Sequence, residues 1–94
     1  MKAAYDSEAN ALGIELVDVD RWDDGGEFDD DYCTIAFSRG CLVYIGLLRP
    51  GENLRLLSAV AGRYGLDEEK LLASASAALA APDHPVTLGD RLAA

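Results

Sequence analysis

Residues 2–19 read KAAYDSEANALGIELVDV, and this stretch decides the fold. A short segment with the composition of a strand is followed by a compact polar turn, after which apolar and polar residues alternate. One face of the alternating run carries three large aliphatic residues, Leu12, Ile14 and Leu16. Because a period of two is typical of a half-buried antiparallel strand, we predict a hairpin of strands over residues 2–5 and 11–19.

A second hairpin is predicted further along the chain. Residues 32–37 and 41–48 have the composition of strands, and the Ser-Arg-Gly between them forms a tight turn in which Gly40 supplies a positive φ. Between the two hairpins, residues 20–31 read DRWDDGGEFDDD, with two glycines and seven acids. This composition predicts a solvated loop.

Two helices are predicted after the strands. Pro50 and the glycine after it end the sheet, and apolar residues then recur at helical spacing over residues 52–64. Gly65 is placed to end that helix. Asp67 is placed to cap a second helix, which ends before Pro82.

These elements predict an α+β fold in one domain, residues 1–94. A small antiparallel sheet of about four strands (residues 1–49) precedes a two-helix hairpin (50–82) that packs on one face of it. The tail, residues 83–94, either adds a short strand or frays. A length of 94 residues fits a single domain with a thin core.

The net charge of −9 is concentrated at the start of the chain. Residues 1–31 hold eleven acids and two bases, whereas residues 32–94 hold six of each. Phosphate backbones would be repelled there, so we expect no nucleic-acid partner and favour a basic protein. The structural alternative is that the acids serve solubility and edge protection. The predicted acidic partner surface comprises Asp20, Asp23, Asp24, Glu27, Asp29, Asp30 and Asp31.

The two cysteines point to a reducing compartment. In the predicted hairpin Cys33 and Cys41 are roughly 13–17 Å apart, whereas a disulfide needs Cα atoms within about 7 Å. Two thiols that do not form a disulfide are typical of a protein in the reducing cytoplasm. The first ten residues lack the apolar region of a signal peptide, and the longest apolar run is too short to span a bilayer. We therefore expect a cytoplasmic protein without membrane partners.

The strands of the second hairpin are apolar on both faces. A two-residue turn would group six side chains on one face: Cys33, Ile35, Phe37, Leu42, Tyr44 and Leu48. Because two helices cover only one face of a small sheet, the other face would expose an aromatic and aliphatic patch. Such patches usually mark an interface, which predicts a homodimer.

The sequence YDSEANALGIEL at residues 5–16, followed by GCLVYIGLL at residues 40–48, resembles a family of small bacterial proteins known as domain of unknown function 2283. The resemblance covers about the first half of the chain. It implies a small α+β domain without an assigned activity. Because such proteins are often encoded near small toxin-like proteins, the resemblance also implies an antitoxin-like or regulatory role.

The chain departs from that family pattern at two places. The family has acids just before the second turn, and Gly then Glu at alternate positions of the following strand; the corresponding residues here are Ile35, Ala36, Phe37, Tyr44 and Gly46. A face that is polar in the family is therefore apolar in this chain. We predict a core of Leu12, Ile14, Leu16, Val43, Ile45 and Leu47. The predicted self- or partner-binding face comprises Ile35, Phe37, Leu42, Tyr44 and Leu48.

Other functions find less support in the residues. The acidic loop has Trp22 at the third position of a calcium-loop count and lacks the bidentate Glu, so only weak divalent association is expected. His84 is the only histidine, and nothing in the spacing pairs it with Cys33 or Cys41 as a nucleophile and base. In a DNA-binding helix-turn-helix, the recognition helix of this chain would begin at the acids Asp67-Glu68-Glu69, which DNA phosphates would repel.

The sequence therefore favours a non-enzymatic interaction or regulatory module without a cofactor that binds a basic protein, and the family resemblance implies that this binding is antitoxin-like. Two alternatives stay open. One is a small ligand-binding or thiol-dependent enzyme domain that uses Cys33, Cys41 or His84. The other is a DNA-binding regulator, which would need a basic surface from Arg55, Arg63, Lys70 and Arg91.

Overall fold

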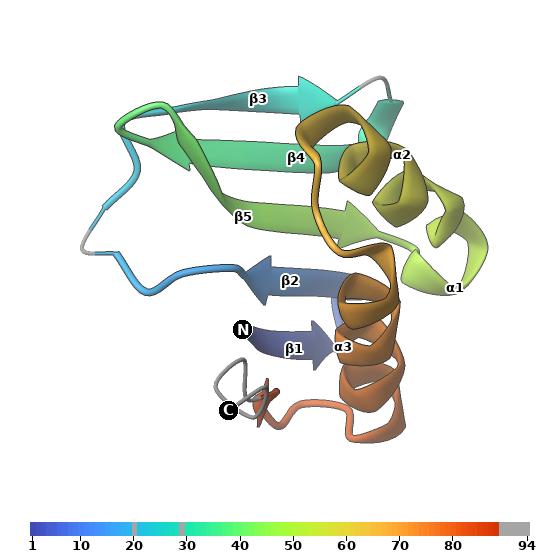
Figure 1. Ribbon diagram of the computed structural model, residues 1–94. Coiled ribbons are helices and arrows are strands. Elements are labelled where there is room, and N and C mark those ends of the chain that lie inside the picture. The colour runs from blue at the N-terminus through green and yellow to red at the C-terminus, as the bar shows by residue number, and fades with distance from the viewer. Residues whose placement is uncertain (20, 29, 89–94) are drawn as a thin grey trace.

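The computed structural model describes residues 1–19, 21–28 and 30–88. Over these residues the chain forms a six-stranded, fully antiparallel sheet in the order β3-β4-β5-β2-β1-β6 (Figure 1). The strands are β1 (Lys2–Asp6), β2 (Ala11–Glu15), β3 (Asp24–Phe28), β4 (Asp30–Ser38), β5 (Cys41–Leu48) and β6 (Val86–Thr87). The expected α+β class is confirmed, with two more strands than predicted.

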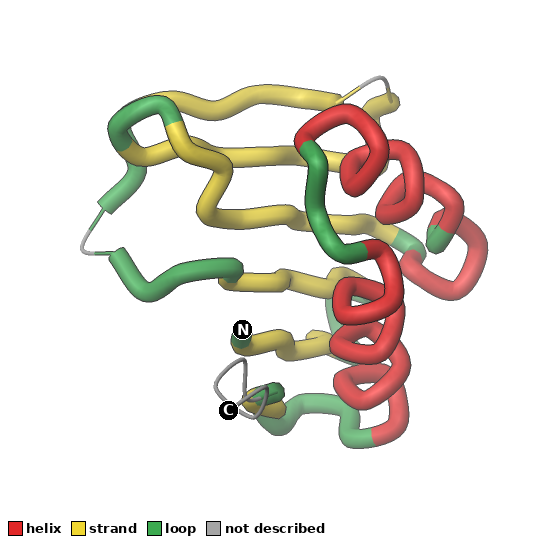
Figure 2. Tube along the Cα trace, in the orientation of Figure 1, coloured by secondary structure: helices red, strands yellow, loops and turns green. Residues whose placement is uncertain are grey.

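The described residues form three helices, all between β5 and β6 in the chain (Figure 2). These are α1 (Pro50–Asn53), α2 (Arg55–Tyr64) and α3 (Glu68–Ala80). The predicted single helix over residues 52–64 is interrupted at Leu54. Gly65 ends α2 with φ 67°, and Asp67 caps α3 by accepting a hydrogen bond from the Lys70 amide, as predicted.

The helices lie on one face of the sheet and bury its apolar side chains (Figure 1). The predicted core residues Leu12, Ile14, Val43, Ile45 and Leu47 are at most 2% exposed, and Leu16 is partly buried against the core. Leu57, Val60 and Leu71 of the helices are buried to the same degree. The helices therefore cover the centre of this face, and the opposite face of the sheet is left for other contacts.

The prediction of a loop over residues 20–31 is wrong for part of that segment. Residues 24–28 form the edge strand β3, and Glu27 pairs with Thr34 of β4. Phe28 is 5% exposed, and its ring centre lies 6.1 Å from that of Tyr64 on α2. Burial of the Phe28 ring holds β3 in place at the edge of the sheet. The exposed acids of β3 discourage pairing with a further strand.

The second hairpin has a different register from the predicted one. Phe37 pairs with Leu42, but a bulge follows, so that Ala36 pairs with Tyr44 and Val43 is the extra residue. A shift of one residue moves side chains to the opposite face. The predicted grouping of Ile35, Phe37 and Leu42 with Tyr44 and Leu48 is therefore wrong: Ile35 is 7% exposed in the core, and Phe37 and Leu42 pack against it.

The segment after α3 returns to β1. Val86 and Thr87 pair with Ala3 and Lys2, so of the two alternatives for the tail, a short strand or fraying, these residues form the strand. The Asp83 amide donates to the carbonyl of Tyr5 at 2.7 Å, which anchors the preceding turn. The rest of the predicted tail, residues 89–94, lies outside the described residues.

Two neighbouring glycines of β3 give a matched pair for testing the edge strand. A Cβ added at Gly25 would lie 2.9 Å from the backbone oxygen of Ile35, whereas one added at Gly26 meets nothing within 4 Å. We expect Gly25→Ala to lower the free energy of unfolding by about 1–2 kcal/mol, because the β4 backbone must move. Gly26→Ala should raise it by about 0.5 kcal/mol through the loss of unfolded-state entropy.

Urea denaturation followed by circular dichroism measures both changes. Equal effects of the two substitutions would contradict the close approach of β3 and β4 at Gly25.

Candidate functional site

The uncovered face of the sheet has a row of small residues that crosses four strands. Gly13 of β2 pairs with Ala4 of β1 on one side and with Gly46 of β5 on the other. Gly46 in turn pairs with Thr34 of β4. Because cross-strand partners point to the same face, these four residues form a low floor that runs across the strands.

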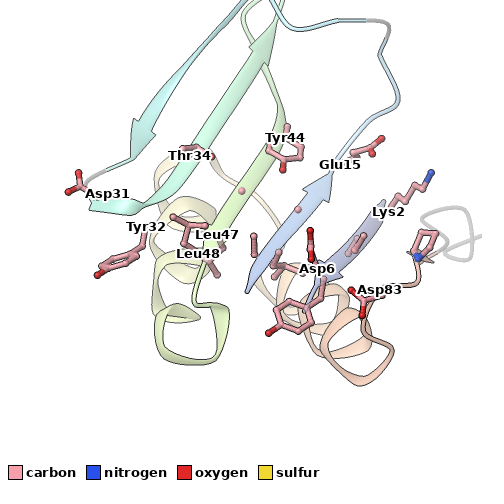
Figure 3. A pocket seen from close by; sticks show the side chains of 18 residues that line it. Lys2, Asp6, Glu15, Asp31, Tyr32, Thr34, Tyr44, Leu47, Leu48 and Asp83 are labelled. Atoms are coloured by element: carbon pink, nitrogen blue, oxygen red, sulfur yellow. The ribbon is translucent and has the colours of Figure 1, made fainter. Parts of the chain in front are cut away.

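Larger side chains flank this floor on both sides. One flanking row consists of Lys2, Glu15 and Tyr44, which are successive cross-strand partners. The other row includes Asp6, Ala11 and Leu48, also successive partners, together with Tyr32. The two flanking rows form the walls of an open groove above this floor. The groove has a volume of about 720 Å³, and we call it the cross-strand groove (Figure 3).

Tyr44 leans over the glycine floor. A Cβ at Gly13 would lie 2.7 Å from the Tyr44 hydroxyl oxygen, and one at Gly46 would lie 3.2 Å from its Cε2. The Trp22 ring stacks on the Tyr44 ring with 4.6 Å between their centres. Burial raises the pKa of the Tyr44 phenol, and the Glu15 carboxylate raises it further, so the hydroxyl stays protonated at neutral pH. The absence of a side chain at Gly13 and Gly46 therefore leaves the space that the Tyr44 ring occupies.

The groove is acidic. Its lining includes four carboxylates, those of Asp6, Glu15, Asp31 and Asp83, and one ammonium group, that of Lys2. Figure 3 shows Asp31 beside Tyr32 at one end of the groove and Asp83 towards the other. An occupant of this groove would meet a predominantly negative rim.

Local hydrogen bonds fix two of these carboxylates. Asp83 accepts from the hydroxyl of Ser7 at 2.6 Å and from its amide at 2.9 Å, and these bonds lower the pKa of the Asp83 carboxyl. Asp6 accepts from the amides of Glu8 and Ala9 at 3.0 and 3.1 Å. Both acids therefore stand at defined positions at the β1 end of the groove.

The structure divides the five residues of the predicted binding face. Tyr44 and Leu48 line the cross-strand groove, but Ile35, Phe37 and Leu42 belong to the helix-covered side. The groove residues that sequence reasoning missed are the small ones, Ala4, Gly13, Gly46 and Thr34. Their only sequence signal is a glycine within each of two apolar strands.

The predicted acidic partner surface is only partly described. Asp23, Asp24, Glu27 and Asp31 are exposed. Asp23 accepts a hydrogen bond from the Arg39 amide at 2.9 Å, next to the β4–β5 turn. Asp30 belongs to β4, while Asp20 and Asp29 lie outside the described residues. The described acids are spread along the β3 side of the sheet, and Asp31 alone among them reaches the groove.

The residues considered for catalysis or metal binding are dispersed. Cys33 is buried in the core, Cys41 is exposed at the start of β5, and His84 is exposed in a turn. Over residues 1–19, 21–28 and 30–88, no three His, Cys, Asp or Glu side chains form a group that could hold a metal ion. In that same part of the chain, no helix has the length and apolarity needed to cross a membrane.

Comparison with known proteins adds no relative. No family model matches the chain, and neither a curated protein nor a solved structure matches it. The similarity of residues 5–16 and 40–48 to domain of unknown function 2283 thus stays a prediction.

Proposed function

We propose that this protein is a non-enzymatic interaction module that binds a basic segment of a partner protein in the cross-strand groove. The observation that carries the proposal is the combination of a floor of small, mainly apolar residues with an acidic rim on the uncovered face of the sheet. An antitoxin-like role, which the family resemblance implies, would be one form of this binding.

The charges favour a basic partner over the other occupants considered. Carboxylates around a groove attract cationic segments and speed their association. Two copies of this chain that met through their grooves would bring like-charged rims together, at an electrostatic cost. The same rim would repel a phosphate backbone.

The groove chemistry supports binding rather than catalysis. Among the described residues, the groove is lined by neither cysteine nor histidine, and its hydroxyl groups belong to Tyr5, Tyr32, Tyr44 and Thr34. A cysteine or hydroxyl nucleophile activated by a histidine base is therefore not available among these residues. The groove instead provides contact area, a defined shape and negative charge for a bound segment.

The proposal is tested by selecting from a displayed library of random 12-residue peptides on the intact protein. We expect enriched peptides to carry net positive charge. For a synthetic copy of an enriched peptide, the double substitution Asp6→Asn with Glu15→Gln should weaken binding about tenfold, because two rim charges are removed. The matched control is Glu52→Gln with Glu69→Gln, the same charge change at exposed helix positions, and it should leave affinity unchanged.

A third variant tests the location. Thr34 is exposed on the floor, so Thr34→Arg puts a long cation into the groove and should abolish binding. Neutral or acidic enriched peptides, or binding that survives Thr34→Arg, would overturn the proposal. Sedimentation gives a further outcome: a dimer of the wild-type chain that Thr34→Arg dissociates would assign the groove to a second copy.

A further inference from the structure

We infer that the segment bound in the cross-strand groove is an extended stretch of about five residues that crosses the strands on the face of the sheet. This inference rests on the proposed function and specifies the shape of the partner. It separates three ways in which a basic segment can bind a sheet: along an edge, as a helix, or across the face.

The length of the floor sets the length of the segment. Ala4, Gly13, Gly46 and Thr34 belong to four adjacent strands, β1, β2, β5 and β4. Three strand spacings of about 4.8 Å make the floor about 14 Å long. An extended chain advances about 3.3 Å per residue, so four or five residues reach from one end to the other.

The width of the groove selects an extended chain over a helix. The walls are set by Tyr44 and Leu48, four residues apart on β5, so their Cα atoms are about 13 Å apart before side chains are counted. Tyr44 leans inward over Gly13 and Gly46, which narrows this space. A helix with its side chains is about 10–12 Å wide and would have to displace Tyr44. An extended backbone is narrower than a helix and would pass beside the Tyr44 ring, between it and Leu48.

The position of the groove argues against strand addition. Gly13 of β2 and Gly46 of β5 lie on interior strands, each paired on both sides, so their ladder hydrogen bonds are already formed. The edge strand β3 exposes Asp24 and Glu27, a pattern that protects edges from pairing. Side chains of the partner, rather than its backbone, would therefore provide most of the contacts with the floor.

The ends of the groove define where the positive charges of the segment belong. Asp31 lies at the β4 end, and Asp6 and Asp83 lie at the β1 end (Figure 3). The floor between them consists of small residues, apolar except for the Thr34 hydroxyl, and the Tyr44 ring lies over Gly13 and Gly46. A segment with a basic residue near each end and small or aliphatic residues between them matches this arrangement.

The test uses capped synthetic peptides of three, five, seven and nine residues, each with two arginines and otherwise valine and serine, so that charge is constant. We expect affinity to rise at least fivefold from three to five residues and less than twofold from five to nine. Trp22 provides the signal, because it is the only tryptophan and stacks on the Tyr44 wall. Amide shifts in the nuclear magnetic resonance spectrum should change at Ala4, Gly13, Gly46 and Thr34.

Three results would overturn the inference. These are an affinity that keeps rising through nine residues, tighter binding of a stapled helical nine-residue peptide of the same composition, and new protection of β3 amides from hydrogen exchange. If Thr34→Arg still abolishes binding in the first two cases, the groove remains the site of a basic segment and only the extended conformation is wrong. If none of these peptides binds above the level of a matched peptide with glutamates in place of arginines, the proposed function itself fails.

Discussion

Replacing Ile45 by alanine is expected to lower the free energy of unfolding by about 3–4 kcal/mol. Ile45 is fully buried at the centre of β5, where it pairs with Ile14 of β2 and Ile35 of β4. Truncation removes buried methyl groups and leaves a cavity under the helices, which the surrounding strands cannot readily close. For a domain whose whole stability is on the order of 5–10 kcal/mol, this is a large loss. Urea denaturation followed by circular dichroism measures it.

The matched control is Leu48→Ala on the same strand. Leu48 is 45% exposed and faces the groove rather than the helices. Its truncation should cost less than about 1 kcal/mol, because little apolar area is returned to water. Equal losses from the two substitutions would contradict the assignment of opposite faces to Ile45 and Leu48.

Replacing Asn53 by leucine is expected to lower the free energy of unfolding by about 2–3 kcal/mol. Asn53 is a buried polar residue, 6% exposed, at the end of α1. Its side-chain amide donates to the carbonyls of Leu48 at 3.0 Å and Arg49 at 3.2 Å, where the chain leaves β5 for the helices. Leucine has a similar size but leaves both carbonyls without this donor. Thermal and urea unfolding measure the change.

Glu52 supplies the control for Asn53. It is the preceding residue and is exposed, so Glu52→Ala should change stability by less than about 0.5 kcal/mol. If Asn53→Leu were as mild as Glu52→Ala, the two amide hydrogen bonds would not stabilise the connection from β5 to α1.

The elements that could be predicted from the sequence are those with local signals. The limits of β5 at residues 41–48 agree with the structure, because a turn glycine precedes the strand and a proline follows it soon after. Gly65 and Asp67 are likewise correctly placed at the ends of α2 and α3, since caps depend on neighbouring residues. Strand β3 was missed because aspartate and glycine are depleted in strands. Its formation depends on pairing with β4 and on the burial of Phe28.

The candidate site was harder to predict because it depends on register. The bulge opposite Ala36 and Phe37 has no local sequence signal, yet it decides whether Tyr44 shares a face with Ile35. The floor also brings together residues from four strands, of which Gly13 and Gly46 are 33 positions apart in the chain. From the sequence, those glycines appear only as interruptions of apolar strands, and their joint role becomes visible once β2 and β5 are paired.

The strand order makes the pairing of β2 with β5 a seam between two halves of the sheet. On one side are β3, β4 and β5, which follow one another in the chain, and on the other are β2, β1 and β6. The floor crosses this seam, with Gly13 on one side and Gly46 on the other. An occupant of the groove would therefore hold both halves at once. Its binding energy would be added to the cost of pulling them apart, so occupancy would strengthen the molecule mechanically where its two halves meet.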